Sequence, residues 1–378
     1  MTRAIRNIAI IAHVDHGKTT LVDFMLRQAG IFRSNEHIAD RVMDSGDLER
    51  EKGITILAKN CAVEYEGTRI NVVDTPGYSN FLWDTRACLR AVDAAVVLVD
   101  AVAGVEVGTE KVWDMLEEYK LPRALIVNKM DRENAHFAPA LESIRQFFGR
   151  QAIPVQIPLG EEKNFRGVVD LLSMKACVFE KDESGKFTEA PVPAEVKDEA
   201  DKRFRELVEM IAEGDEKLME TYLDKGELSP EEILAGLKAG IASRQIFPVF
   251  AAAGGANIGV QPFCDRVVGF LPSPLDRPEI DVTINDRPGT LKPSPDGPFA
   301  ALVFKTISDP YTGRISMMRV FSGKMTPDGT AVNPGKEIDE KFSGFFFLQG
   351  KEQAPAGAAV AGDILATRKV LFIFERLY

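Results

Sequence analysis

Cysteine is scarce in this chain of 378 residues, which contains four: Cys61, Cys88, Cys177 and Cys264. No two of them form a CxxC pair, so the sequence offers neither a disulfide framework nor the ligand spacing of a structural zinc site. This use of cysteine is typical of a reducing compartment, and we therefore expect a cytoplasmic protein.

Long apolar runs are also missing. No stretch of about 18 uncharged apolar residues occurs, so we expect no transmembrane helix. The nearest candidate, 92–107, is interrupted by Asp93, Asp100 and Glu106. The N-terminus lacks the long apolar core of a signal peptide, and we expect no membrane partner.

Positive charge is in deficit, because the formal net charge is -11. Binding of free nucleic acid usually needs a general basic field, so we expect no free-DNA partner. Docking on a large RNA machine through local patches stays open. Hydrophobic residues make up 45% and charged residues 27%, as in soluble globular proteins. The length predicts two or three domains with ample core.

The segment Asn7–Thr20, NIAIIAHVDHGKTT, has the order of a phosphate-binding loop. Its apolar start predicts a buried strand, His13–Gly17 a polar turn, and Lys18 the start of a helix. Loop amides and the helix dipole would hold polyphosphate, with Lys18 reaching the β- and γ-phosphates and the Thr19 hydroxyl binding Mg²⁺. Ala12 replaces the first Gly of the pattern and is small enough to fit. The alternative is an ordinary strand–turn–helix.

Two further segments have the properties of nucleotide-sensing switches. Region 27–60 is long and polar, which favours a functional or mobile loop, and it ends in GITI around Thr55. Thr55 would give Mg²⁺ a second hydroxyl, or alternatively it simply enters a strand. Thr68–Asp74 predicts a strand followed by DTPG. Asp74 would hold Mg²⁺ through water, and the Gly77 N–H would bond the γ-phosphate at an approach that only Gly permits.

The most discriminating motif is NKMD at Asn128–Asp131, which follows the apolar run Ala124–Val127. Guanine presents an N1–H and an exocyclic amino group, and the Asp131 carboxylate can accept both. Adenine lacks that pattern and would leave the carboxylate unpaired, at a cost of several kcal/mol. Asn128 would brace the loops and the Lys129 stem would lie over the base. The alternative is a polar strand-to-helix turn.

The three motifs occur in order, each at the carboxyl end of a predicted strand. The run Ala94–Ala101, apolar except for Asp100, predicts a further strand that is buried on both faces of a parallel sheet. This order is typical of βαβ units in a doubly wound sheet. We therefore predict an α/β fold of the P-loop GTPase type, with GTP or GDP and Mg²⁺ as ligands.

Four motifs also resemble those of the translation-factor GTPases: HVDHGKTT at His13–Thr20, EREKGITI at Glu49–Ile56, DTPG at Asp74–Gly77 and NKMD at Asn128–Asp131. The first half resembles the BipA/TypA branch, and later segments such as 298–325 resemble elongation factor G. The resemblance covers nearly everything from residue 6 to about 370. It implies a monomer that hydrolyses GTP to GDP and phosphate on the ribosome and contacts both subunits.

The resemblance also assigns site residues. It makes Thr55 the switch threonine, matches Val14 and Ile54 to an apolar gate beside the attacking water, and matches Asp15 to an aspartate associated with a monovalent cation. The expected nucleotide-binding residues are His13, Val14, Asp15, His16, Gly17, Lys18, Thr19, Thr20, Asp74, Gly77, Asn128, Lys129, Asp131, Ala252, Ala253 and Gly254. The expected catalytic residues are Lys18, Thr55, Gly77 and Tyr78, and the expected metal ligands are Thr19 and Thr55.

The chain departs from the family pattern at two places. The family reads DTPGH, with the His positioning water, whereas this chain has Tyr78. Tyrosine has a hydroxyl but cannot become cationic, so hydrolysis is expected to be slow, differently triggered or lost, while binding survives. The guanine-contacting Ser-Ala loop reads Ala252-Ala253-Gly254 and lacks the Ser. The histidines offer no evident substitute, and solvated positions are their default interpretation: His13, His16, His37 and His136.

We expect a GTP-binding domain at 1–275 with an insertion at about 157–244, a linker at 276–297, a small second-domain β-barrel at 298–370 and an atypical tail at 371–378. The acidic helical segment Ala194–Ser243 of the insertion is interpreted as a solvated face. The resemblance offers an alternative, a surface that faces a ribosomal stalk protein.

The apolar ending LFIFERLY matches no family pattern, and elongation factor G continues into further domains where this chain stops. We expect a truncated or frameshifted copy, or an excised fragment, whose tail is an association hazard. Two other functions stay open: a GTP-dependent ribosome-binding module with little or no hydrolysis, and an inactive gene remnant.

Overall fold

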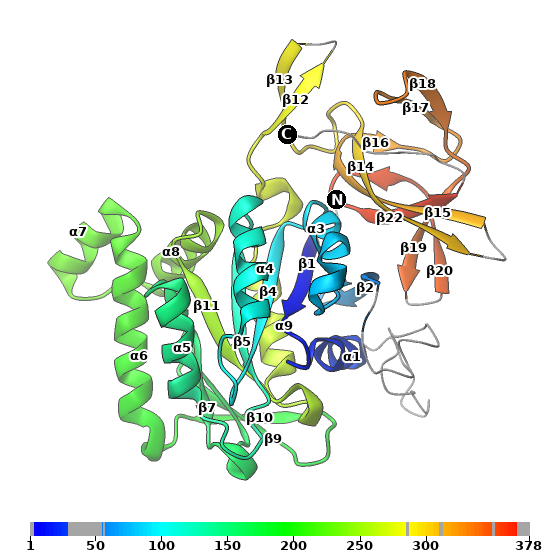
Figure 1. The fold of residues 1–378 in the computed structure, drawn as a ribbon. Coiled ribbons are helices and arrows are strands. Elements are labelled where there is room, and N and C mark those ends of the chain that lie inside the picture. The colour runs from blue at the N-terminus through cyan, green and yellow to red at the C-terminus, as the bar shows by residue number, and fades with distance from the viewer. Residues whose placement is uncertain are drawn as a thin grey trace.

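The computed structural model describes residues 4–28, 55, 57–284, 287–309, 313–349 and 352–368. Its centre is a sheet with the strand order β2-β3-β1-β4-β5-β11-β6 (Figure 1). All neighbours in this order are parallel except β2 and β3. The strands are β1 (Ala4–Ala12), β2 (Lys59–Tyr65), β3 (Thr68–Asp74), β4 (Ala94–Asp100), β5 (Arg123–Asn128), β6 (Ala152–Pro154) and β11 (Phe247–Ala251). The predicted α/β class is confirmed.

Helices cover both faces of this sheet: α1 (Lys18–Gln28), α3 (Leu82–Leu89), α4 (Val107–Glu118), α5 (Phe137–Phe148) and α9 (Val260–Phe270). Every residue of β3, β4 and β5 is buried, which explains the apolar runs 94–99 of β4 and Ala124–Val127 of β5. One apolar cluster contains Leu116 of α4 and Ile144 of α5, and a second contains Met25 of α1 and Phe263 of α9. Truncation of any such side chain to Ala would cost roughly 2–5 kcal/mol of stability.

A separate antiparallel sheet, with the order β10-β9-β8-β7, follows the core strands. Its strands are β7 (Gln156–Leu159), β8 (Gly167–Asp170), β9 (Lys175–Phe179) and β10 (Phe187–Pro191). The chain changes sheets at Val155, between β6 and β7. The Val155 amide donates to Val249 of β11, while its carbonyl accepts from Leu171 beyond β8. One residue thus joins the two sheets.

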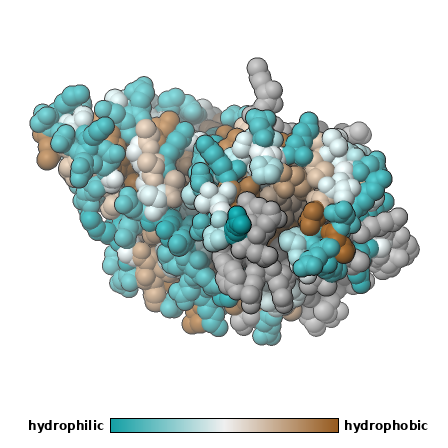
Figure 2. All heavy atoms as spheres, turned by 90° about the horizontal axis from the view of Figure 1, so that it is seen from above, coloured by the Kyte–Doolittle hydropathy of each residue, from teal (hydrophilic) through white to brown (hydrophobic). Residues whose placement is uncertain are grey.

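Three helices complete this inserted region: α6 (Ala194–Glu213), α7 (Glu216–Lys225) and α8 (Pro230–Ala242). Helix α8 begins with a capping box, in which the Ser229 hydroxyl accepts from the Glu232 amide at 3.2 Å and the Glu232 carboxylate accepts from the Ser229 amide at 2.8 Å. Figure 2 shows mostly hydrophilic residues over the region of these helices, at the left of the view. That surface agrees with the interpretation of a solvated acidic face.

The region after α9 is rich in short strands. It begins with a hairpin of β12 (Ile280–Ile284) and β13 (Arg287–Leu291), where the sequence predicts a linker. The other strands are β14 (Ala300–Asp309), β15 (Gly313–Ser322), β16 (Lys324–Met325), β17 (Thr330–Asn333), β18 (Ile338–Lys341), β19 (Phe345–Gln349), β20 (Glu352–Ala356), β21 (Ala359–Val360) and β22 (Ile364–Arg368). A turn at 361–362 separates β21 from β22, and the Asp363 carboxylate that follows this turn accepts from the Val360 amide at 2.9 Å.

This β-rich part lies against the α/β part (Figure 1). Its order β14-β15-β22-β19 continues into the core sheet through one pairing, Gln349 of β19 with Cys61 of β2. In the described part of the chain, no helix combines the length and apolar character that a membrane span needs. The expected tail 371–378 and most of the predicted switch region 27–60 lie outside the described residues.

Candidate functional site

The loop between β1 and α1 has a backbone that its glycine makes possible. Gly17 has φ +91°, and a Cβ there would lie 2.6 Å from Asn128 Nδ2, so both conformation and space exclude other residues. The Gly17 carbonyl accepts from the Leu21 amide at 3.0 Å and so begins α1. Lys18 is buried and Asp15 is exposed with φ 62°. The amides of this tight loop and the N-terminus of α1 form the type of cradle that holds phosphate.

Three oxygen-bearing side chains converge beside this loop, although they come from distant segments. The Thr19 and Thr55 hydroxyl oxygens lie 3.0 Å apart, and the Thr19 hydroxyl donates to Asp74 Oδ2 at 3.3 Å. All of these ligand atoms are hard oxygens, the kind that Mg²⁺ prefers. The predicted metal residues are therefore adjacent in space. Ile54, the predicted partner of Val14 in an apolar gate, lies outside the described residues.

The DTPG turn after β3 is held against β1. The Thr75 hydroxyl donates to the Ile10 carbonyl at 2.8 Å, so the turn follows the strand that leads to the phosphate loop. Gly77 then comes so near Lys18 that a Cβ there would lie 2.7 Å from the lysine Nζ. The structure thus brings together Lys18 and Gly77, two residues predicted to contact the γ-phosphate.

The loop after β5 connects two other loops. Asn128 Nδ2 donates to the His16 carbonyl at 2.9 Å, and Asn128 Oδ1 accepts from the Gly254 amide at 3.0 Å. Ala252 joins the same arrangement, because its carbonyl accepts from the Met130 amide at 3.2 Å. The loop of Ala252, Ala253 and Gly254 is therefore adjacent to the NKMD loop even though it lacks the family's Ser.

Lys129 is positioned by a residue that the sequence analysis missed. Its Nζ donates to the Asp15 carbonyl and lies 3.0 Å from Asp100 Oδ2. Burial raises the pKa of Asp100, but hydrogen bonds from the Val102 and Ala103 amides and from Lys129 outweigh it, so the net pKa is lowered. The sequence feature that could have indicated Asp100 is its place at the carboxyl end of β4, a buried strand of the same sheet. Asp131 follows this loop and is exposed to solvent.

The default interpretation of the histidines is wrong for His16, which is 2% exposed. Its Nε2 lies 2.7 Å from a carboxylate oxygen of Glu106, and its Nδ1 lies 3.1 Å from the Leu98 carbonyl. The ring therefore faces the protein interior between β4 and α4, and only the main chain of His16 is available to the loop. His13 is partly buried and His136 is exposed, while His37 lies outside the described residues.

Tyr78 follows the DTPG turn and is 37% exposed. Its carbonyl accepts from the Phe81 amide at 3.0 Å, which begins the short turn before α3. Among the described residues, its hydroxyl has no hydrogen-bond partner.

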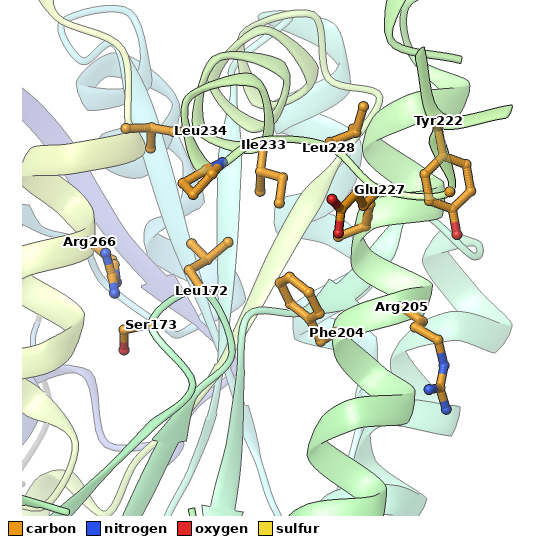
Figure 3. Close-up of a pocket in the computed structure, with 13 residues that line it drawn as sticks. Leu172, Ser173, Phe204, Arg205, Tyr222, Glu227, Leu228, Ile233, Leu234 and Arg266 are labelled. Carbon is orange, nitrogen blue, oxygen red and sulfur yellow. The ribbon is translucent and has the colours of Figure 1, made fainter. Parts of the chain in front are cut away.

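A cavity of about 500 Å³ lies elsewhere, between α6, α8 and α9 (Figure 3). Its wall is mainly apolar, with Leu172, Phe204 and Ile233, and Arg266 at one side is paired with Asp170 at 2.6 and 2.8 Å. None of the predicted nucleotide residues lines it. An apolar wall with a neutralised guanidinium does not suit polyphosphate, so the phosphate loop remains the better candidate site.

Comparison with known families agrees with this geometry, because the family model described as elongation factor Tu GTP binding domain matches residues 3–273. The chain belongs to this family of translation GTPases. A second family model, elongation factor G domain 2, matches residues 298–372. The elongation factor G-like resemblance is therefore confirmed, and the family implies a guanine nucleotide site.

The fold is also similar to a solved structure, the crystal structure of ttk003000868 from Thermus thermophilus. The TM-score is 0.84 and the sequence identity is 28%. The match covers 97% of this chain and 52% of the other. This translation GTPase chain thus spans about half the length of the structure it matches.

Proposed function

We propose that this chain is an elongation factor G-like translation factor that binds GTP with Mg²⁺ and hydrolyses it to GDP and phosphate on the ribosome, in the cytoplasm. The observation that carries the proposal is the convergence of the Thr19 hydroxyl, the Thr55 hydroxyl and the Asp74 carboxylate at a phosphate loop. These groups come from the three segments that the sequence motifs assign to phosphate and metal.

The residues present fit Mg²⁺. Thr19 and Thr55 would hold it directly, and Asp74 would hold it through water; the ion supplies charge neutralisation on the phosphates. Lys18 places its ammonium beside Gly77, where negative charge would develop on the γ-phosphate. Phosphoryl transfer depends on positioning and electrostatics more than on covalent chemistry, and this arrangement provides both.

The base would lie against the loops after β5 and β11. Exposed Asp131 would accept from guanine N1–H and the amino group, while Lys129, held by Asp15 and Asp100, would cover the ring. The backbone of Ala252, Ala253 and Gly254 would meet the guanine oxygen. The amides from His13 to Thr20 would hold the phosphates, and of His16 only the main chain would take part, since its ring is buried.

We also propose the domain division 1–275, 276–297 and 298–370, with the insertion at about 157–244. In this proposal the β-rich part contacts the small subunit, and the GTP-binding part contacts the large subunit. The chain acts as a monomer and has no free DNA and no membrane as partners. The second-domain match at 298–372 supports the ribosomal assignment.

A second candidate is a GTP-dependent ribosome-binding module with little or no hydrolysis. The observation in its favour is Tyr78, which stands where the family has a water-positioning His and has no hydroxyl partner in the described residues. A phenol cannot become cationic, so the electrostatic part of water activation would be lost while binding remained.

Single-turnover GTP hydrolysis with and without ribosomes tests the two functions, with nucleotide affinity measured in parallel. We expect tight GTP binding and ribosome-stimulated turnover by the unmodified chain. Tyr78→His is expected to raise the ribosome-stimulated rate by about a hundredfold, the lower end of the range for one well-placed general acid or base.

The other outcomes are equally specific. Tight binding without turnover, rescued by Tyr78→His, would favour the binding module. Failure of the folded chain to bind GTP would contradict both proposals and favour an inactive remnant. Tyr78→Phe is the matched control, because it removes the hydroxyl and keeps the ring.

A further inference from the structure

Lys305 of β14 is a buried cation that reaches from the β-rich part into the α/β part. Its side chain is 7% exposed, and its Nζ donates to Asp84 Oδ2 and to the Ala58 carbonyl, each at 2.7 Å. The Ala58 amide donates to the same Asp84 oxygen at 2.6 Å. Both main-chain groups of Ala58 are thus engaged by one buried ion pair.

The two partners of Lys305 stand directly beside the predicted switches. Ala58 follows Thr55, whose hydroxyl contacts Thr19 of the phosphate loop. Asp84 lies in α3, which follows the DTPG turn, and its neighbour Thr85 donates its hydroxyl to the Pro76 carbonyl of that turn at 3.3 Å. One ammonium from the β-rich part therefore binds a residue near the end of the first switch region and a residue of the helix that follows the second.

A second buried ion pair joins the same two parts but lies away from the switches. Arg319 of β15 donates to both Asp93 oxygens, at 2.8 and 2.9 Å, and both side chains are 1% exposed. Asp93 immediately precedes β4, whereas the phosphate and base loops follow the carboxyl ends of the strands. The Asp93–Arg319 pair is therefore a control for the Lys305–Asp84 pair. It too is a buried cation–carboxylate pair between the two parts, but it lies away from Thr55 and Gly77.

We propose that Lys305 is a positioning residue that holds both switches in the arrangement in which Thr55 reaches the phosphate loop. The proposal rests on the proposed GTP binding and adds to it that the β-rich part favours the triphosphate state. A change in either switch that moved Ala58 or Asp84 away would leave the buried Lys305 ammonium without that partner. Because an unpaired buried charge is strongly destabilising, such a change would cost free energy. A group that stabilises one of two states shifts the equilibrium between them by its differential interaction.

The test compares affinities for GDP and for a non-hydrolysable GTP analogue in the full chain. We expect Lys305→Met to weaken analogue binding relative to GDP binding by about fivefold or more, the lower range for coupled sites. Asp84→Asn should move the ratio in the same direction, and Lys305→Arg should restore part of it. Arg319→Met should leave the ratio unchanged, although it lowers thermal stability.

Several results would overturn the proposal. Lys305→Met could change both affinities equally, or Arg319→Met could shift the ratio as much as Lys305→Met does. If Lys305→Met and Lys305→Gln both fail to fold, Lys305 is a structural anchor and the proposal falls. Absence of nucleotide binding by the unmodified folded chain would instead contradict the proposed function, so the two failures are distinguishable.

Discussion

The side-chain amide of Asn128 donates to the main-chain carbonyl of His16 at 2.9 Å, which joins the loop after β5 to the loop between β1 and α1. Its oxygen accepts from the Gly254 amide, so one buried side chain holds three loops. The relative position of the three loops therefore depends on the Asn128 side-chain amide, which donates one hydrogen bond and accepts another.

Asn128→Ala should therefore weaken GDP and GTP-analogue binding together, by about tenfold or more. It leaves a buried carbonyl and a buried N–H without their partner, which costs about 1–3 kcal/mol each in stability. Nucleotide titration and urea denaturation measure the two effects. Gln146→Ala, on the exposed side of α5, is the control; equal affinities for Asn128→Ala and the unmodified chain would contradict this role.

Gly77→Ala should reduce nucleotide affinity with little effect on folding. The new methyl group would lie 2.7 Å from Lys18 Nζ, and the flexible end of the lysine must move away from its place beside the turn. We expect a loss of GTP-analogue affinity of about tenfold, corresponding to about 1.4 kcal/mol. Gly269→Ala is the control, because a Cβ there meets nothing within 4 Å. Unchanged affinity would show that Lys18 does not bind from this position.

Removal of Arg319 should destabilise the whole chain. Arg319→Met removes both hydrogen bonds that the guanidinium donates to the buried Asp93 carboxylate. Removal of one partner of a buried ion pair lowers the free energy of unfolding by about 3–5 kcal/mol. Thermal unfolding should show a large fall in melting temperature. The double variant Arg319→Met/Asp93→Asn should recover part of the loss, because it neutralises the buried carboxylate and keeps an oxygen that can accept from Asn7 and Arg277. A double variant no more stable than Arg319→Met would argue against the charge explanation.

Acid should weaken the fold through Asp100, whose pKa is lowered in the folded chain. A carboxylate with a lowered folded pKa contributes stability above its unfolded pKa, about 3.9, and loses it as pH falls through the folded value. The free energy of unfolding should therefore decline below about pH 4. Asp100→Asn should be less stable at pH 7 and should decline less steeply in acid, as urea denaturation across pH would record. If the free energy of unfolding falls equally steeply in acid for Asp100→Asn and for the unmodified chain, other carboxylates cause the decline.

Much of the site could be predicted because its motifs are local. A strand that runs into a turn with Gly17 and then into Lys18 depends on backbone sterics and hydrogen bonds within a few residues. The same holds for β3 with its DTPG turn, for the strand before Asn128 and for the Ser229 cap. In each case the sequence predicted the element correctly.

Contacts between distant segments were decided by tertiary structure alone. His16 has the pattern of an exposed loop residue, but β4 and Glu106 bury its ring. The run Ile153–Leu159 is strand-like throughout, yet its two ends pair with two different sheets. Lys305 and Asp84 are 221 positions apart, and no spacing rule connects them. Local patterns determine which element forms, whereas the partner of a buried charge depends on which strands become neighbours, a property of the folded chain as a whole.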